Sequence, residues 1–254
     1  MIIHQLPHDM ISLEPEPKVF AFDPRFYMAC QMKEVYISHA CKADYIIMMN
    51  GRNEKNQSLP ESELMNLCQV LRPNEIVIPD DEDFESHASI AMRFQNRFPN
   101  AKIVMNIQGK TAKELTDSFF RINHSPSTNK IGIPDLQIER SALLTNLNIE
   151  IYYKKINIIP ILIQEICSYS ELDMMSYRWL KDSTIITTRA IRLAMDGILL
   201  SDSLRQEPKK RNIEKFRLKY LEFPIAYNWN KIKLEAMSEQ RHLSFNEWIN
   251  QAPF

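Results

Sequence analysis

The sequence predicts an α/β fold, namely a (β/α)8-type TIM barrel. Three apolar runs rich in β-branched residues begin at residues 75, 101 and 130, and they deliver the polar side chains Asp80, Gln108 and Asp135. Buried parallel strands that each deliver a polar group at the carboxyl end are how a TIM barrel builds its active site. The length of 254 residues also matches a single barrel of this kind.

Other apolar runs extend this pattern along the chain. They occupy 18–23, 43–51 and 156–163, and a weaker candidate lies around 179–182. Continuous apolar runs, rather than alternating ones, are typical of parallel strands that are covered on both faces. Eight clear strands cannot be placed, so the expected barrel is either an incomplete variant or one whose last strand is disguised.

The segments between the runs carry helix signals. Ser58 and Pro60 stand where a helix begins, and apolar residues follow them at helical spacing. Thr111 to Glu114 has the pattern of a capping box. Further helices are expected within 90–98, 139–146 and 163–180. Strands that alternate with helices predict βαβ units with right-handed crossovers.

The chain changes character after about residue 200. We expect residues 1–200 to form the barrel and residues 201–254 to form a basic, helical extension packed on it. The basic side chains of the extension either form a solvated helix face or hold a phosphate backbone. The candidates for backbone contact are Lys209, Lys210, Arg211 and Lys215.

Composition narrows the function classes. The formal net charge is −1, which by itself makes no case for nucleic acid or membrane. No apolar run reaches 18 residues and the first residues lack a signal-peptide pattern, so we expect a cytoplasmic protein without a membrane partner. The four cysteines contain no C-x-x-C pair, and the four glycines form no phosphate loop. We therefore expect no metal and no cofactor.

Four short motifs point to a family. They are Asn50-Gly51, Asp80, Gln-Gly-Lys-Thr at 108–111 and Ile-Gly-Ile-Pro at 131–134. In this order and at this spacing they resemble the tRNA-guanine transglycosylase superfamily over residues 43–200, and most closely its phage and bacterial branch that inserts 7-deazaguanine into DNA. The resemblance implies exchange of guanine in nucleic acid for a 7-deazaguanine base through an aspartyl–sugar intermediate. A partner protein or a homo-oligomer is left open.

The resemblance also implies roles for individual residues. Asp182 would be the nucleophile, because a carboxylate can trap oxocarbenium-like charge at a sugar. Asp80 would take part in catalysis and bind the base edge with Gln108, because Asp accepts from N–H groups and Gln offers both donor and acceptor. Gly132 would let a backbone group approach the flat base. The base-binding set is completed by Asn50 and Gly109.

The sequence departs from the family at three places. Met49 stands where the family has a general-base aspartate, so either Asp81 or Asp23 supplies the base, or the activity is altered or lost. The zinc cluster of the tRNA-acting enzymes has no counterpart among the cysteines, which favours DNA over tRNA. Ile185-Ile186 replaces the Leu-Pro that follows the family's nucleophile.

The site residues also have structural interpretations. Asp80 and Asp135 can cap the segments that follow their strands, and Asp182 can cap a helix over 185–193. The acidic run 80–83 is either a solvated loop or a cation site. Two rival functions follow: a divergent family member that binds a nucleobase or nucleic acid without exchange, and an unrelated barrel enzyme acting on a nucleotide or sugar.

Overall fold

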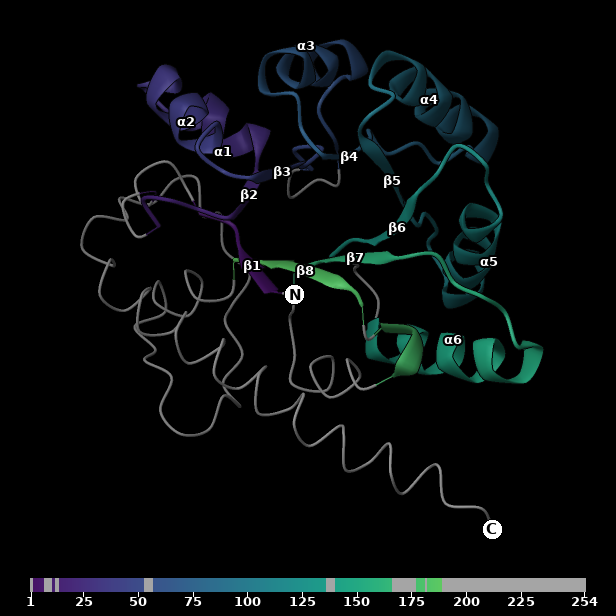
Figure 1. Ribbon diagram of the computed structural model, residues 1–254. Helices are drawn as coiled ribbons and strands as arrows, with labels where there is room; N and C mark the ends of the chain where they lie inside the picture. The colour runs from purple at the N-terminus through teal and green to yellow at the C-terminus, as the bar shows by residue number, and fades with distance from the viewer. Residues whose placement is uncertain are drawn as a thin grey trace, which may run out of the picture.

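The strands form a parallel barrel. The computed structural model describes residues 2–6, 11, 14–52, 57–135, 140–165, 177–180 and 182–188. Every hydrogen-bonded pair of strands is parallel, and Figure 1 shows the strands around a ring with the helices outside it. The strands are β1 (Ile2–His4), β2 (Val19–Phe22), β3 (Tyr45–Met48), β4 (Glu75–Val77), β5 (Lys102–Asn106), β6 (Lys130–Ile133), β7 (Ile161–Gln164) and β8 (Thr184–Thr187). The predicted (β/α)8 TIM-barrel fold is confirmed.

The ring is nearly closed. The strand order is β1-β8-β7-β6-β5-β4-β3-β2, and within the described residues no backbone ladder joins β1 to β2. A side-chain hydrogen bond bridges this seam instead, because Gln5 Nε2 donates to Asp23 Oδ2 over 2.6 Å. Gln5 follows β1 and Asp23 follows β2, so the bridge lies at the carboxyl end of the barrel.

Helices connect the strands, and several of them begin at a side-chain cap. They are α1 (Pro24–Ala29), α2 (Lys33–Ala40), α3 (Glu61–Leu71), α4 (Phe84–Arg97), α5 (Ala112–Asn123), α6 (Arg140–Lys154) and the 3-10 helix η2 (Arg178–Leu180). Asp83 caps α4, and the predicted capping box of Thr111 and Glu114 is present at α5. Among the described residues, no helix has the length and apolar character needed to cross a membrane.

Apolar side chains fill both faces of the sheet. On the outer face, buried side chains such as Phe22, Ile76 and Phe94 pack between the strands and the helices. The barrel interior holds a smaller cluster, made of Ile3, Ala21, Ile47, Met49, Val77, Val104, Leu162 and Ile186. Both faces of the strands are therefore apolar, which explains why their sequences are continuous apolar runs.

The amino end of the interior holds a buried ion pair. Lys130 Nζ, at the start of β6, donates to both carboxylate oxygens of Glu75 at 2.9 Å and to Thr184 Oγ1 at 3.1 Å. Tyr45 Oη donates to Glu75 Oε1 over 2.8 Å. Burial, followed by the bond to Glu75, raises the pKa of Tyr45, so the phenol stays a donor. We call these four residues the amino-end cluster.

Two strands differ from the prediction. β1 is only three residues long and is not part of a long apolar run, so the sequence does not indicate a strand there. β8 occupies part of the segment that was expected to hold a catalytic loop and a helix over 185–193, and η2 stands where the weaker strand was expected. The β8 segment, Thr184-Ile185-Ile186-Thr187, is too short and too polar at its ends to look like a buried run.

The expected extension 201–254, with Lys209, Lys210, Arg211 and Lys215, lies outside the described residues.

Candidate active site at the carboxyl end of the barrel

A cleft of about 720 Å³ opens where β4 and β5 end. Asp80 follows β4 and Gln108 follows β5, so the parallel sheet brings these two predicted residues to one cleft. Side chains of α4 and α5 form its other walls. Besides Asp80 and Gln108, its lining includes Arg52, Asp81, His87 and Lys110. We call this the β4–β5 cleft.

Asp80 is held so that one carboxylate oxygen is occupied and the other faces the cleft. Oδ1 accepts from Asn106 Nδ2 at 2.8 Å and from Asn50 Nδ2 at 3.2 Å. The Asp80 backbone N–H donates to Ser58 Oγ at 3.0 Å. Oδ2 has no hydrogen-bond partner among the described residues, although Arg52 Nη1 forms an ion pair with it at 3.5 Å. The predicted base-site residue Asn50 therefore acts here through Asp80.

A line of buried amides continues from Asp80 across the barrel. Gln164 Nε2, at the end of β7, donates to Asn106 Oδ1 over 2.6 Å. A Cβ atom on Gly132 would lie 2.0 Å from that same Asn106 oxygen. The resemblance implies that Gly132 admits a flat base, but the structure places the Asn106 amide in that space. Gly132 thus makes room for the amide that orients Asp80.

The loop after β5 presents Gln108 to the cleft. Its backbone N–H donates to Ser118 Oγ on α5 at 3.0 Å, whereas its side-chain Nε2 has no partner within the described residues. A Cβ atom on Gly109 would lie 2.7 Å from Glu114 Cβ and 2.9 Å from the Leu115 backbone nitrogen. Gly109 therefore lets the loop pass close to the first turn of α5, which sets where Gln108 stands.

Unsatisfied buried atoms gather in this cleft. Across the described residues, six buried side-chain nitrogen or oxygen atoms lack a hydrogen-bond partner: Arg52 Nε, Arg52 Nη1, Asp80 Oδ2, His87 Nε2, Gln108 Nε2 and His39 Nε2. All except His39 Nε2 belong to residues that line the β4–β5 cleft. A buried polar group without a partner costs about 1–3 kcal/mol, so this concentration marks a place where water or a ligand supplies the partners.

The sequence did not point to His87 or Arg52. His87 lies near the start of α4, where its backbone N–H donates to the backbone carbonyl of Asp83 at 2.9 Å. The residue is 1% exposed. Burial lowers the pKa of His87, while the nearby carboxylates of Asp80 and Asp81 act in the opposite direction. One sequence signal could have indicated that His87 lies near Asp80: it stands four residues after the cap of the helix that follows Asp80. Arg52 follows directly on Asn50-Gly51.

Asp182 lies at the other end of the barrel. It precedes β8, whereas Asp80 and Gln108 follow their strands, and all of these strands are parallel. Its neighbours around a cavity of about 790 Å³ include Tyr45, Glu75 and Lys130 of the amino-end cluster. The resemblance implies that Asp182 attacks the sugar of a base held by Asp80 and Gln108, and its place at the opposite end of the barrel contradicts that role. The segment was read as the end of a strand, but it is the residue before one.

The carboxylate at the end of β7 is Glu165, which sequence reasoning missed. It is 9% exposed and accepts from Thr187 Oγ1 at 2.7 Å, from the Thr188 N–H at 3.0 Å and from Thr188 Oγ1. Its φ of +64° is a left-handed conformation that costs a residue other than glycine about 1–2 kcal/mol. Gln164-Glu165 continues the apolar run 156–163, so the rule that identified Asp80 applied here too.

Arg140 braces the backbone around Glu165. Its guanidinium is buried at the start of α6 and donates to Pro134 O at 3.0 Å, to Gln164 O at 2.8 Å and to Glu165 O. These bonds tie the ends of β6 and β7 together. A non-glycine residue persists in a strained conformation only where its surroundings fix it, and such residues cluster at functional sites.

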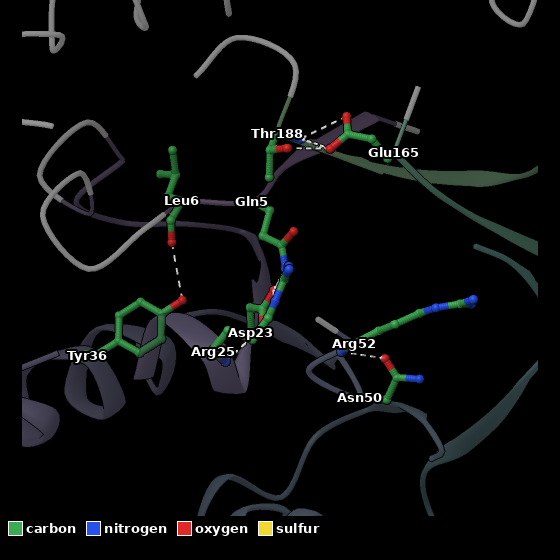
Figure 2. A network of polar contacts seen from close by, with 9 residues as sticks. All are labelled: Gln5, Leu6, Asp23, Arg25, Tyr36, Asn50, Arg52, Glu165 and Thr188. Carbon is green, nitrogen blue, oxygen red and sulfur yellow. Dashed lines mark hydrogen bonds and ion pairs between the residues drawn. The ribbon is translucent and has the colours of Figure 1, made fainter. Parts of the chain in front are cut away.

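Asp23 and Asp81, the two candidates for the missing base, are engaged differently. Asp23 is 1% exposed and accepts from Gln5 and from the Arg25 side chain, with Arg25 Nε at 3.0 Å from Oδ2. Figure 2 shows Gln5 between the Asp23–Arg25 pair and the Thr188–Glu165 pair. Asp81 accepts from Ser86 Oγ and the Asp83 N–H, and these bonds lower its pKa. Asp81 thus serves the start of α4, as the loop interpretation predicts.

Comparison with known proteins bears on the fold. No family model matches the chain, and no curated protein matches it. The solved structure of the YdjI aldolase from Escherichia coli K12 is similar, with a TM-score of 0.54 and 12% identity over 94% of this chain and 90% of that one. At this identity the likeness shows the fold alone. The comparison and the strand order together establish the chain as a (β/α)8 TIM barrel.

Proposed function

We propose that this barrel exchanges guanine in nucleic acid, DNA rather than tRNA, for a 7-deazaguanine base. The observation that carries the proposal is that Asp80 Oδ2 and Gln108 Nε2 belong to the same cleft. Both atoms are buried, and neither has a hydrogen-bond partner among the described residues. The edge of guanine and of 7-deazaguanine presents N–H donors beside a carbonyl acceptor. Asp80 complements the donors and Gln108 complements the carbonyl.

The chemistry needs a carboxylate at the same end of the barrel, and we assign it to Glu165. Attack by Glu165 on the anomeric carbon forms a C–O bond and breaks the C–N bond, and the electron pair leaves with guanine, which takes a proton from solvent. The entering base re-forms the C–N bond, displaces the carboxylate and releases a proton. The bonds from Thr187 and Thr188 orient the Glu165 carboxylate, which a nucleophile at a sugar requires.

A covalent trap tests this function. The chain is incubated with a guanine-containing DNA oligonucleotide and 7-deazaguanine, and a denaturing gel reports any protein–DNA adduct. We expect an adduct in the wild-type chain and in Asp182→Asn, and none in Glu165→Gln. Asp182→Asn is the matched control, because that carboxylate lies at the opposite end of the barrel. An adduct that survives in Glu165→Gln and disappears in Asp23→Asn would move the nucleophile to β2.

One observation favours a second candidate, a barrel that binds the base without exchanging it. Met49 is 6% exposed and packs in the apolar interior cluster, so it offers no proton acceptor where the family has an aspartate. This alternative predicts saturable binding of 7-deazaguanine, no adduct and no release of labelled guanine from DNA. Absence of any base binding would instead favour an unrelated barrel enzyme.

A further inference from the structure

The unpartnered atoms of the β4–β5 cleft are of two chemical kinds. Arg52 Nε, Arg52 Nη1 and Gln108 Nε2 are donors, whereas Asp80 Oδ2 accepts and His87 Nε2 accepts when the ring is neutral with its proton on Nδ1. The imidazole is buried, and burial lowers its pKa, so the neutral ring is the form that faces the cleft at neutral pH. With its proton on Nδ1, His87 adds an acceptor that neither the sequence motifs nor the resemblance supplied.

The hydrogen bonds of guanine show why a second acceptor is needed. Its edge carries one N–H on the ring and two on the exocyclic 2-amino group, and these donors need acceptors once they are buried. Asp80 Oδ1 is already occupied by the amides of Asn50 and Asn106, which leaves Oδ2, at 3.5 Å from Arg52 Nη1 and without a hydrogen bond in the described residues, to meet the base. One open carboxylate oxygen does not serve both donor groups well.

Of the four other carboxylates that line the cleft, Glu82 and Asp117 are exposed to solvent, whereas Asp81 and Glu114 are engaged by hydrogen bonds. The Asp81 oxygens accept from Ser86 and from the Asp83 backbone. The Glu114 carboxylate accepts from the backbone N–H groups of Lys110 and Thr111 in the capping box. His87 Nε2 is in contrast buried, lines the cleft and has no partner within the described part of the chain.

We infer that His87 Nε2 accepts a hydrogen bond from the 2-amino group of the bound base and so selects guanine-type bases over bases that lack this group. The inference rests on the proposed function, because it takes the cleft to be the base site. His87 is then a specificity-determining contact rather than a catalytic residue. Hypoxanthine is the natural probe, since it keeps the ring N–H and the carbonyl of guanine but has no 2-amino group.

Equilibrium binding of guanine and hypoxanthine to the wild-type chain and to His87→Leu tests the inference. We expect wild-type protein to prefer guanine by about 30-fold, because the analogue leaves buried acceptors unpaired. In His87→Leu, guanine affinity falls by about tenfold while hypoxanthine affinity changes by less than about threefold. His87→Gln, which keeps an acceptor on a side chain of similar length, retains most of the preference.

His39→Leu is the matched control. His39 is also buried, its Nε2 also lacks a partner in the described residues, and it lines a separate cavity beside α2. We expect this variant to keep the full preference for guanine. Equal affinity of wild-type protein for both bases, or an unchanged preference in His87→Leu, overturns the role of His87 and leaves the base site standing. Failure of wild-type protein to bind either base overturns the base site and the role of His87 together.

Discussion

The two ends of the barrel interior each hold charged groups, and they differ in how those groups are paired. In the amino-end cluster, Lys130 Nζ contacts three oxygens and both oxygens of Glu75 accept hydrogen bonds. In the β4–β5 cleft, Arg52, Asp80, His87 and Gln108 each carry a buried atom without a hydrogen-bond partner among the described residues. In the amino-end cluster the hydrogen bonds of the ion pair are made within the protein, whereas the Arg52–Asp80 ion pair of the cleft, at 3.5 Å, leaves hydrogen-bonding atoms open to a ligand. Position in a TIM barrel agrees with this contrast, since the active site lies at the carboxyl end of the strands.

The largest expected effect comes from removing one charge of the amino-end cluster. Lys130→Met leaves the Glu75 carboxylate buried without its cation, and we expect the free energy of unfolding to fall by about 3–5 kcal/mol. Urea denaturation measures it. The double variant Lys130→Met with Glu75→Leu removes both charges and should recover most of the loss. A single variant that loses less than about 1 kcal/mol would show that the amino-end cluster is not the paired unit described here.

The second effect tests the amide line that orients Asp80. In Gly132→Ala the new Cβ would clash with Asn106 Oδ1, so we expect the free energy of unfolding to fall by about 1–3 kcal/mol and 7-deazaguanine affinity to fall at least about tenfold. Adding Asn106→Gly removes the clash but also takes a hydrogen-bond partner from Asp80 Oδ1 and Gln164 Nε2, so we expect stability to recover only in part and affinity to stay low. Recovery of both together would mean that Asn106 does not position Asp80.

The third effect concerns the unpaired end. Asp80→Asn keeps an oxygen that can accept from Asn50 and Asn106, so we expect the free energy of unfolding to change by less than about 1.5 kcal/mol. Urea denaturation measures the free energy of unfolding of both variants, and we expect the loss in Asp80→Asn to be much smaller than the loss in Lys130→Met. A loss as large as that of Lys130→Met would place Asp80 among the structural charges.

The fourth effect is a pH dependence that His87 introduces. Its pKa is lowered from the ordinary value of 6.5 by burial, so the unfolded chain binds a proton at a higher pH than the folded chain does. As pH falls below 6.5, protonation of the unfolded chain removes stability until the folded-state pKa is passed. We expect wild-type protein to lose stability more steeply than His87→Gln over that window, in urea unfolding at a series of pH values. Parallel curves would show that His87 is not buried as a neutral ring.

The smallest effect sets the baseline. Arg93 and Glu61 form a short two-point ion pair on the surface, and the Arg93 side chain is 52% exposed. Solvent screens such pairs, so Arg93→Ala should change the free energy of unfolding by less than about 1 kcal/mol. A larger loss would mean that short contacts alone, without burial, carry the energy assigned to the amino-end cluster.

Particular residues show how far the sequence could be read. Asp80 and Gln108 were predictable because each directly follows a buried apolar run, and strand spacing then brings them to one end of a barrel. Asp182 was misplaced because β8 is a short strand with threonines at both ends, so the acid before it looked like the end of another strand. Glu165 follows the run at 156–163 and fits the same rule, but the resemblance implies a nucleophile further along the chain, at Asp182.

Other site features depend on packing that no local pattern encodes. His87 and Arg52 become informative only through burial and the absence of a partner in the described structure. Asn106 sits inside an apolar run, and its contacts with Asp80 and Gln164 join residues 26 and 58 positions apart. Gly132 looked like a ligand-facing glycine, yet the space beside it holds the Asn106 amide.

The central claim is that the unpaired atoms of the β4–β5 cleft are contacts for a guanine-type base. A crystal structure of the chain with 7-deazaguanine tests it most directly. We expect the base in the cleft, with its N–H edge within hydrogen-bond distance of Asp80 Oδ2 and its carbonyl oxygen within that distance of Gln108 Nε2. Ordered water that satisfies these atoms while the base binds elsewhere, such as in the cavity beside Asp182, would contradict this assignment.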